Sequence, residues 1–229
     1  MSYVIPPAPQ ASVAVEGSSD RFPVRRIFCV GRNYAEHILE MGNDERDPPF
    51  YFTKPADAVV ESGAEIAYPR ATADLHHEVE LVLAIGTGGS DISLSDAMAH
   101  VWGAGVGIDL TRRDLQAVAK KAGRPWDMAK GFDRSAPLGA LVPVAQAGGL
   151  TSGEIWLTVN GEPRQTGDLA EMIWSAADCV AHLSTLVELA PGDLIMTGTP
   201  AGVSAVGRGD MMEAGIDGLP NVSVKIAAS

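Results

Sequence analysis

The sequence predicts a β-rich α+β domain, and three observations lead to this fold class. The 229 residues include 25 glycines and 15 prolines spread along the chain, which favours many turns and short strands over a helical bundle. Short β-favouring runs follow one another at hairpin spacing and do not alternate regularly with helices. Hydrophobic residues make up 46% and charged residues 20%, so the chain is expected to fold around a core.

The first segment differs in composition from the rest. Residues 1–25 carry Pro6, Pro7 and Pro9, and are predicted to form an extended lead-in on the surface of a single domain at 26–229. The N-terminus has neither the basic nor the apolar region of a signal peptide, and no run of about 18 apolar residues is present. We therefore expect a cytoplasmic protein that does not enter a membrane.

Strands broken by glycine and proline are predicted from residue 26 to residue 100. Runs rich in β-branched and aromatic residues end at Gly31, Pro55 and Pro69, and Asn33 is placed to cap a helix that continues to Met41. The predicted elements are strands at 26–30, 51–54, 65–68 and 77–85, and a helix at 94–100.

The second half is predicted from three kinds of signal. Glycine in an apolar run permits close approach of buried strands, Asn-Gly favours a tight hairpin turn, and apolar residues at helical spacing indicate a helix. The predicted elements are a buried strand (101–109), a helix with Thr111 and Asp114 at capping-box-like spacing (111–122), a hairpin turning at Asn160-Gly161 (155–165), an amphipathic helix (175–189) and short strands (193–197, 210–213 and 222–226).

The charge balance and the cysteines exclude several classes of protein. Lys and Arg number 17 against 29 Asp and Glu, for a net charge of −12, so nucleic acids and anionic membranes are poor partners. Cys29 and Cys179 lie in apolar runs without partners at metal-ligand spacing. They are expected to be buried free thiols in a reducing compartment.

An acidic pair opens the strand predicted at 77–85. Glu78 and Glu80 are two residues apart, so their side chains point to one face about 7 Å apart at Cα, where repulsion and desolvation favour a bound cation. Asp109 ends the next apolar run and can add a third carboxylate; oxygen ligands without cysteine favour Mg²⁺, Mn²⁺ or Ca²⁺ over zinc. The alternative is a solvated strand end with Asp109 capping a helix, and spacing alone leaves both open.

A candidate base lies on the helix predicted after Asn33. His37 and Glu40 are three residues apart, so a carboxylate can touch the imidazole and raise its basicity for activating water. The alternative is a solvated helical pair. Arg32 and Tyr34 offer hydrogen-bond donors in the preceding loop, where substrate contacts often lie.

Isolated polar groups also stand at strand ends. Lys54, Lys130 and Thr199 are of this kind, and the two lysines either trap a small organic anion or are ordinary surface residues. His76 and His77 precede the acidic pair; a histidine at a strand edge is more often structural, or a partner of a metal ligand, than a ligand itself.

Seven segments together resemble the fumarylacetoacetate hydrolase family, in its short acylpyruvase and fumarylpyruvate hydrolase branch. They are CVGRNYAEHILEMG, FTKPADAVV, LHHEVELVLAIG, GIDLTRRDLQ, PWDMAKGFD, LTVNGEPRQTG and LIMTGTPAGV, in matching order from about residue 26 to the C-terminus. The resemblance implies a mixed-sheet roll as the catalytic domain and a homodimer. The roles that it implies are binding of one Mg²⁺ or Mn²⁺ (Glu78, Glu80 and Asp109), water activation on a lid segment (His37 and Glu40), stabilisation of the reacting carbonyl (Lys130) and contacts to substrate (Arg32, Tyr34, Gln165 and Thr199).

The activity implied is hydrolysis of a carbon–carbon bond in an acylpyruvate, a small dicarbonyl carboxylate. The segments FPVRRIFCVGRNYA and PPFYFTKPADAVV most resemble the fumarylpyruvate hydrolases of gentisate breakdown, so fumarate and pyruvate are the expected products of an aromatic catabolic step. The alternatives are an oxaloacetate decarboxylase or tautomerase, or a 2-oxo-heptenedioate isomerase, on the same type of site. A non-enzymatic binding protein is disfavoured because no expected ligand or base position is replaced.

Overall fold

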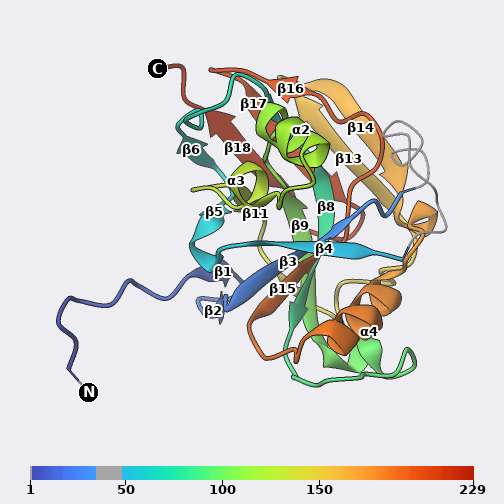
Figure 1. Cartoon of the computed structure of the whole chain (residues 1–229). Helices are drawn as coiled ribbons and strands as arrows, with labels where there is room; N and C mark the ends of the chain where they lie inside the picture. The colour runs from blue at the N-terminus through green and yellow to red at the C-terminus, as the bar shows by residue number, and fades with distance from the viewer. Residues whose placement is uncertain (1, 35–47) are drawn as a thin grey trace.

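The computed structural model describes residues 2–34 and 48–229, which form a β-rich α+β fold with few helices, as predicted (Figure 1). The strands are β1 (Ser12–Ala14), β2 (Arg21–Pro23), β3 (Arg26–Gly31), β4 (Phe50–Lys54), β5 (Val59–Glu61), β6 (Ala64–Ile66), β7 (Leu75–His76), β8 (Val79–Ile85), β9 (Val101–Ile108), β10 (Thr111–Arg112), β11 (Ala136–Leu138), β12 (Val142–Pro143), β13 (Glu154–Val159), β14 (Glu162–Asp168), β15 (Asp193–Met196), β16 (Ala205–Val206), β17 (Met211–Ile216) and β18 (Val222–Ile226). The helices are α2 (Arg113–Lys121), α3 (Asp127–Lys130), α4 (Ala176–Leu186) and the 3₁₀ segments η1 (Ala56–Ala58), η2 (Ala97–His100) and η3 (Leu169–Glu171).

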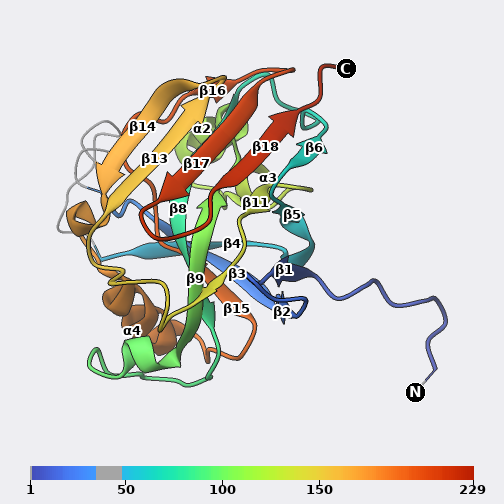
Figure 2. The ribbon, with the colours of Figure 1, turned by 180° about the vertical axis from the view of Figure 1, so that it is seen from behind.

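A mixed eight-stranded sheet forms the centre of the molecule. Its strands run in the order β4-β3-β15-β8-β9-β11-β5, with β12 paired to β9; β3 with β15 and β5 with β11 are parallel, and the other pairs are antiparallel. A five-stranded sheet, β14-β13-β17-β18-β6, covers one face, as Figure 2 shows. Most of the hydrophobic core lies between these two layers and under α4.

The pairing of β8 with β9 explains the glycines in the second strand. Gly107 stands opposite Glu80, and a Cβ at Gly107 would lie 2.7 Å from the Val82 side chain and 2.8 Å from that of Leu138. A side chain at residue 107 would have to push both of these side chains aside, so glycine suits the tight packing around this strand. The same register brings the start of β8 beside the end of β9, where Asp109 follows.

Two other elements agree with the expectations. Asn160 and Gly161 connect β13 to β14 with φ of 54° and 80°, the conformation of a tight hairpin turn. Helix α4 begins after Ser175, whose hydroxyl accepts from the Asp178 amide while the Asp178 carboxylate accepts from the Ser175 amide. The predicted helix at 175–189 is thus confirmed, although it ends earlier.

Three predicted boundaries are wrong. The helix expected at 94–100 is only the 3₁₀ segment η2, and the strand expected at 65–68 lies at Ala64–Ile66. Helix α2 starts at Arg113, because residues 111 and 112 pair with β7 as β10. Asp114 accepts instead from Thr72 Oγ1 at 2.7 Å, so no capping box forms with Thr111.

The first 25 residues are only partly an extended lead-in. Strands β1 and β2 pair with each other, and Val13, Phe22 and Val24 are buried in a cluster with residues of β15. The residues ahead of them extend away from the body (Figure 1), with Tyr3 and Val4 exposed. Both cysteines are free and buried, as predicted. No helix in the described part of the chain is long and apolar enough to cross a membrane.

Candidate active site

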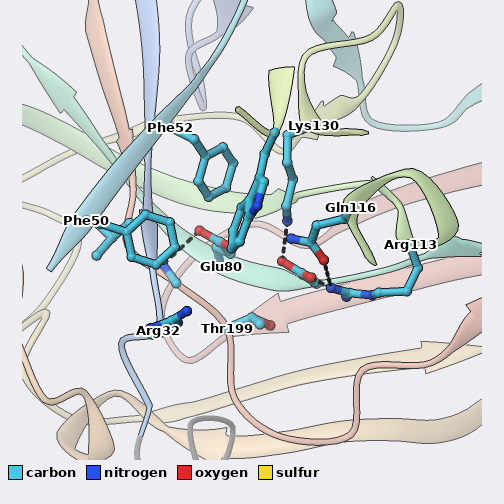
Figure 3. A pocket seen from close by; sticks show the side chains of 13 residues that line it. Arg32, Phe50, Phe52, Glu80, Arg113, Gln116, Lys130 and Thr199 are labelled. Atoms are coloured by element: carbon cyan, nitrogen blue, oxygen red, sulfur yellow. Dashed lines mark hydrogen bonds and ion pairs between the residues drawn. The ribbon is translucent and has the colours of Figure 1, made fainter. Parts of the chain in front are cut away.

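A pocket opens where β3, β4 and β8 meet α2, α3 and the loop after β15 (Figure 3). Figure 3 shows Phe50 and Phe52 on one side and Arg113 and Gln116 on the other, with Glu80 between them. The lining residues are Val30, Gly31, Arg32, Phe50, Phe52, Glu78, Glu80, Arg113, Gln116, Trp126, Lys130, Gly198 and Thr199.

Three buried carboxylates converge at the base of this pocket. Glu78 precedes β8, Glu80 lies on it, and Asp109 follows β9, where its amide donates to the Glu78 carbonyl at 2.8 Å. One oxygen of each carboxylate lies within 4.8 Å of the others. The solvated strand end considered above is wrong, because all three residues are buried. These are the three residues that the sequence proposed as ligands, and their set of oxygen atoms fits a hard divalent cation.

Three cations surround the carboxylates. Lys130 Nζ lies 2.7 Å from Glu78 Oε2 and 2.7 Å from Asp109 Oδ2. Lys54 Nζ lies 2.8 Å from Asp109 Oδ1, and Arg113 pairs with Glu78 Oε1. Lys54 is 2% exposed and Lys130 1%, so neither is an ordinary surface residue. We call these three cations and the three carboxylates the floor of the pocket.

Among the described residues, no lysine or arginine pairs with Glu80, so burial of its negative charge is unfavourable. Its Oε2 accepts from the Gly198 amide at 2.8 Å. Burial, followed by the charges of Asp109 and Glu78, raises the pKa of Glu80 well above its ordinary range. A divalent cation bound here would stabilise the charged carboxylate that burial and its acidic neighbours disfavour.

The loop after β15 is fixed by main-chain contacts. Asn33 Nδ2 donates to the Thr197 carbonyl at 2.7 Å and to the Trp174 carbonyl at 2.8 Å, and its Oδ1 accepts from the Trp174 amide. Gly198 has φ of 96°, and a Cβ there would lie 2.7 Å from Asn33 Cβ, so a side chain would both strain the backbone and collide. Asn33 thus holds the loop that presents Gly198 to Glu80; the helix predicted to follow it lies outside the described residues.

Behind the pocket wall, three polar side chains form a buried chain of hydrogen bonds. Thr199 Oγ1 accepts from Gln165 Nε2 at 2.7 Å, and Gln165 Oε1 lies 2.8 Å from His77 Nδ1. Burial lowers the pKa of His77 to about 4, so its imidazole is neutral at neutral pH. Gln165 therefore lies behind Thr199, which itself faces the pocket.

Aromatic side chains and one arginine form the pocket mouth. The Phe50 and Trp126 rings meet edge to face at 5.1 Å between centroids, and Phe52 lies 5.9 Å from Trp126. The Arg32 guanidinium lies 5.2 Å from the Phe50 centroid, and Arg32 has φ of 63°, a left-handed conformation that is uncommon for a residue other than glycine. We call Arg32, Phe50, Phe52 and Trp126 the rim.

With this geometry in view, comparison with known proteins decides the family. Residues 26–227 match the family Fumarylacetoacetate (FAA) hydrolase C-terminal. The chain belongs to the fumarylacetoacetate hydrolase family. It is thus an enzyme of this family, and the predicted fold type is confirmed.

Two solved structures of this family are similar over the whole chain. The fumarylpyruvate hydrolase of Pseudomonas aeruginosa in complex with Mn²⁺ and pyruvate is 52% identical, with a TM-score of 0.97 and coverage of 100% of both chains. A putative fumarylpyruvate hydrolase of Burkholderia cenocepacia is 55% identical, with a TM-score of 0.94, over 100% of this chain and 96% of the other. The Mn²⁺ in the first of these structures supports a divalent cation on the acidic floor of this chain.

A sequence relative in the family bears another name. The mitochondrial oxaloacetate tautomerase of Rattus norvegicus is 41% identical over 205 residues, which cover 90% of this chain and 93% of the relative. Similarity alone therefore does not distinguish a fumarylpyruvate hydrolase from an oxaloacetate tautomerase.

Of the remaining predicted site residues, the structure describes Tyr34. Tyr34 is buried away from the pocket lining, and among the described residues its hydroxyl has no hydrogen-bond partner. Burial raises the pKa of that hydroxyl. His37 and Glu40 lie outside the described residues. The roles of all these residues stay predictions.

Sequence reasoning gave no role to several pocket residues. Arg113 and Gln116 stand three apart on α2 and share a hydrogen bond, a spacing that the sequence alone could have flagged. For Lys54 the sequence offered only a general role, as part of a trap for a small organic anion, and not its pairing with Asp109. The rim aromatics gave no local signal, because only the folded chain brings Trp126 beside β4.

Proposed function

We propose that this enzyme hydrolyses acylpyruvates, with fumarylpyruvate as substrate and fumarate and pyruvate as products. The charge of the floor carries the proposal. Because Lys54, Lys130 and Arg113 already match Glu78, Glu80 and Asp109 in charge, a bound divalent cation leaves the floor with surplus positive charge. A substrate with a carboxylate beside a carbonyl group complements that surplus.

The floor residues have defined parts in this proposal. Mg²⁺ or Mn²⁺ held by Glu78, Glu80 and Asp109 would supply Lewis-acid polarisation of the 2-oxo acid. The Lys130 ammonium has three donors, of which two reach carboxylates at 2.7 Å. We assign the third to the oxygen that becomes negative when water adds to the distal acyl carbonyl.

The proton for this step is assigned to residues outside the described part of the chain. His37, oriented by Glu40, takes a proton from the attacking water as its oxygen bonds to the acyl carbon. The bond from that carbon to the neighbouring methylene then breaks, and the electron pair stays with the pyruvate fragment. That fragment regains a proton at the methylene carbon, while the acyl part leaves as a carboxylic acid.

The rim favours an unsaturated acyl group that ends in a second carboxylate. A flat acyl chain can pack against the rings of Phe50, Phe52 and Trp126 with its distal carboxylate toward Arg32. Fumarylpyruvate has both features. Oxaloacetate has two carboxylates but no chain long enough to fill the space along the rings.

Oxaloacetate tautomerisation or decarboxylation is the second candidate. The name of the relative from Rattus norvegicus favours tautomerisation, and both reactions need only the floor of the pocket. The greater identity to the fumarylpyruvate hydrolase of Pseudomonas aeruginosa supports the first candidate.

A substrate comparison tests the two candidates. Purified protein is assayed with Mg²⁺ or Mn²⁺ against fumarylpyruvate, acetylpyruvate and oxaloacetate. We expect kcat/KM to be highest for fumarylpyruvate by at least about tenfold, a difference that one charged hydrogen bond supplies. Turnover of oxaloacetate without cleavage of either acylpyruvate would contradict the proposal.

We further propose that the enzyme is a cytoplasmic homodimer acting in gentisate-type aromatic catabolism. The likeness to fumarylpyruvate hydrolases supports this setting, whereas the relative from Rattus norvegicus is named as mitochondrial. Light scattering after gel filtration tests the dimer against the chain mass of 23.9 kDa.

A further inference from the structure

We propose that His77 is a positioning residue, which acts through Gln165 to make the Thr199 hydroxyl a hydrogen-bond donor to a carboxylate in the pocket. The proposal deepens the proposed function, on which it rests for the carboxylate substrate. It is built on a chain of contacts from the start of β8 through β14 to the loop after β15.

The orientation of the Gln165 amide is fixed by two main-chain groups. The Val79 amide, which can only donate, lies 3.1 Å from Oε1, and the Pro200 carbonyl, which can only accept, lies 2.9 Å from Nε2. Exchanging the two amide atoms would break both contacts at once. Oε1 therefore faces His77, and Nε2 faces Thr199.

This orientation assigns the proton on His77. Because Gln165 Oε1 only accepts, His77 Nδ1 at 2.8 Å must carry the proton. In the neutral ring Nε2 is then an acceptor, and the Ser204 hydroxyl at 2.9 Å donates to it. Both ring nitrogens of a fully buried histidine are thus used in holding Gln165 and the chain at residue 204.

The direction of donation continues to the pocket. Gln165 Nε2 donates one proton to Pro200 and the other to Thr199 Oγ1, at 2.7 Å. Thr199 Oγ1 is already an acceptor, so its own proton is available for another oxygen. Across residues 2–34 and 48–229 no acceptor takes this proton, and Thr199 faces the pocket that also holds Lys130 and Arg113 (Figure 3).

The consequence is a donor of fixed direction in an anion-binding pocket. A threonine hydroxyl without such a partner rotates and can donate or accept. Without the His77 donor, Gln165 Oε1 keeps only the Val79 amide at 3.1 Å, so the Gln165 side chain is held less firmly and its contact with Thr199 loosens. The Thr199 hydroxyl would then be freer to rotate, and its donation to an anion would weaken.

A double-mutant cycle on oxalate binding tests the proposal. Oxalate, a small dianion that resembles the 2-oxo acid end of the substrate, is titrated calorimetrically into Mn²⁺-loaded wild type, His77→Leu, Thr199→Val and the double variant. We expect about tenfold weaker binding in each single variant, the size of one hydrogen bond to a charged group. The double variant should also lose about tenfold, because His77 acts only through Thr199.

Two further variants identify the donor. The amide nitrogen of His77→Asn falls near the Nδ1 position and can donate to Gln165, whereas that of His77→Gln falls near Nε2. Asparagine should restore the oxalate affinity to within about threefold of wild type, and glutamine should not. A threefold loss corresponds to under half of the free energy of one hydrogen bond to a charged group. This pair decides the question if His77→Leu does not fold. His100→Leu, which removes a histidine whose ring contacts the Thr87 carbonyl and which does not line the pocket, is the control and should bind as wild type does.

The outcomes are distinct. An additive loss of about a hundredfold in the double variant, wild-type binding by His77→Leu, or equal binding by the asparagine and glutamine variants would overturn the role of His77. Oxalate binding needs no turnover, so a failure of the proposed hydrolysis is read separately, in the substrate comparison. With fumarylpyruvate, we expect His77→Leu to raise KM and leave kcat within about threefold, because the loss is in substrate binding.

Discussion

The floor and the rim of the pocket are held in different ways. Floor side chains come from the central strands or pack against them, and each carboxylate has a hydrogen bond or ion pair with a buried partner. Rim side chains stand at the ends of β3 and β4 and beside α3, and touch one another through ring faces and one guanidinium group. Ring contacts are weaker and less directional than charged hydrogen bonds.

This difference separates the chemistry of the site from the choice of substrate. A metal-binding floor needs fixed oxygen atoms, and the pairing of β8 with β9 brings the carboxylates together at the ends of these strands. The rim can exchange side chains without disturbing the sheet, because few of its contacts are hydrogen bonds. We expect substitutions in the floor to remove every activity, and substitutions in the rim to change the preference among substrates.

The largest effect is expected for Glu80→Gln. This change keeps the shape of the side chain but removes a ligand charge, so it should lower hydrolysis and any oxaloacetate turnover together by about a thousandfold or more, the several kcal/mol that a metal contributes. Calorimetry with Mn²⁺ should show the matching loss of metal affinity. Glu65→Gln, with the same charge change at an exposed pair with Lys225, is the control. Full activity of Glu80→Gln after chelation would show that the floor binds no catalytic metal.

The next largest effect should separate acylpyruvate hydrolysis from oxaloacetate decarboxylation. Glu40→Gln and His37→Ala should lower acylpyruvate hydrolysis by at least about a hundredfold, since a general base contributes about 10²–10⁴-fold. Metal affinity and most of any oxaloacetate decarboxylation should remain, because that reaction needs no activated water. Rates measured side by side on fumarylpyruvate and oxaloacetate test this separation. Wild-type hydrolysis by Glu40→Gln would show that the base lies elsewhere.

The third effect is on stability and compares buried with exposed charge. Lys54→Met leaves Asp109 without one buried partner and should lower the free energy of unfolding by about 3 kcal/mol. The matched control is Lys225→Met, which removes an ion pair of the same 2.8 Å length between side chains that are 43% and 54% exposed. That change should cost less than about 1 kcal/mol. Urea unfolding of the metal-free proteins measures both, and equal losses would show that burial does not strengthen the floor.

The smallest effect is expected at the rim. Arg32→Asn removes the guanidinium group, and asparagine accepts the left-handed conformation of this position better than most residues do. KM for fumarylpyruvate should rise about tenfold, as for loss of one charged contact, while KM for acetylpyruvate, which has no distal carboxylate, should change less than about twofold. Equal changes in KM for the two substrates would show that Arg32 does not select between them.

Local patterns predicted the elements that depend on local physics. The Asn160-Gly161 turn and the strand at 77–85 follow from conformational preference and period-two hydrophobicity, and both are present, although β8 begins only at Val79. The start of α2 was misplaced because residues 111 and 112 pair with β7, a partner more than thirty residues away in sequence. A pattern read within one segment carries no information about such a partner.

The sequence by itself determined the β-rich class, the three carboxylates of the floor, and the family likeness on which the proposed chemistry rests. Charge type and period-two geometry act within a few residues, so they can be read along the chain. Only the tertiary structure decided that Lys54 and Lys130 are buried against Asp109, that Gln165 stands behind Thr199, and that His77 holds it there. These contacts join residues that are 21 to 88 positions apart, and their geometry depends on how the strands pair and the layers pack.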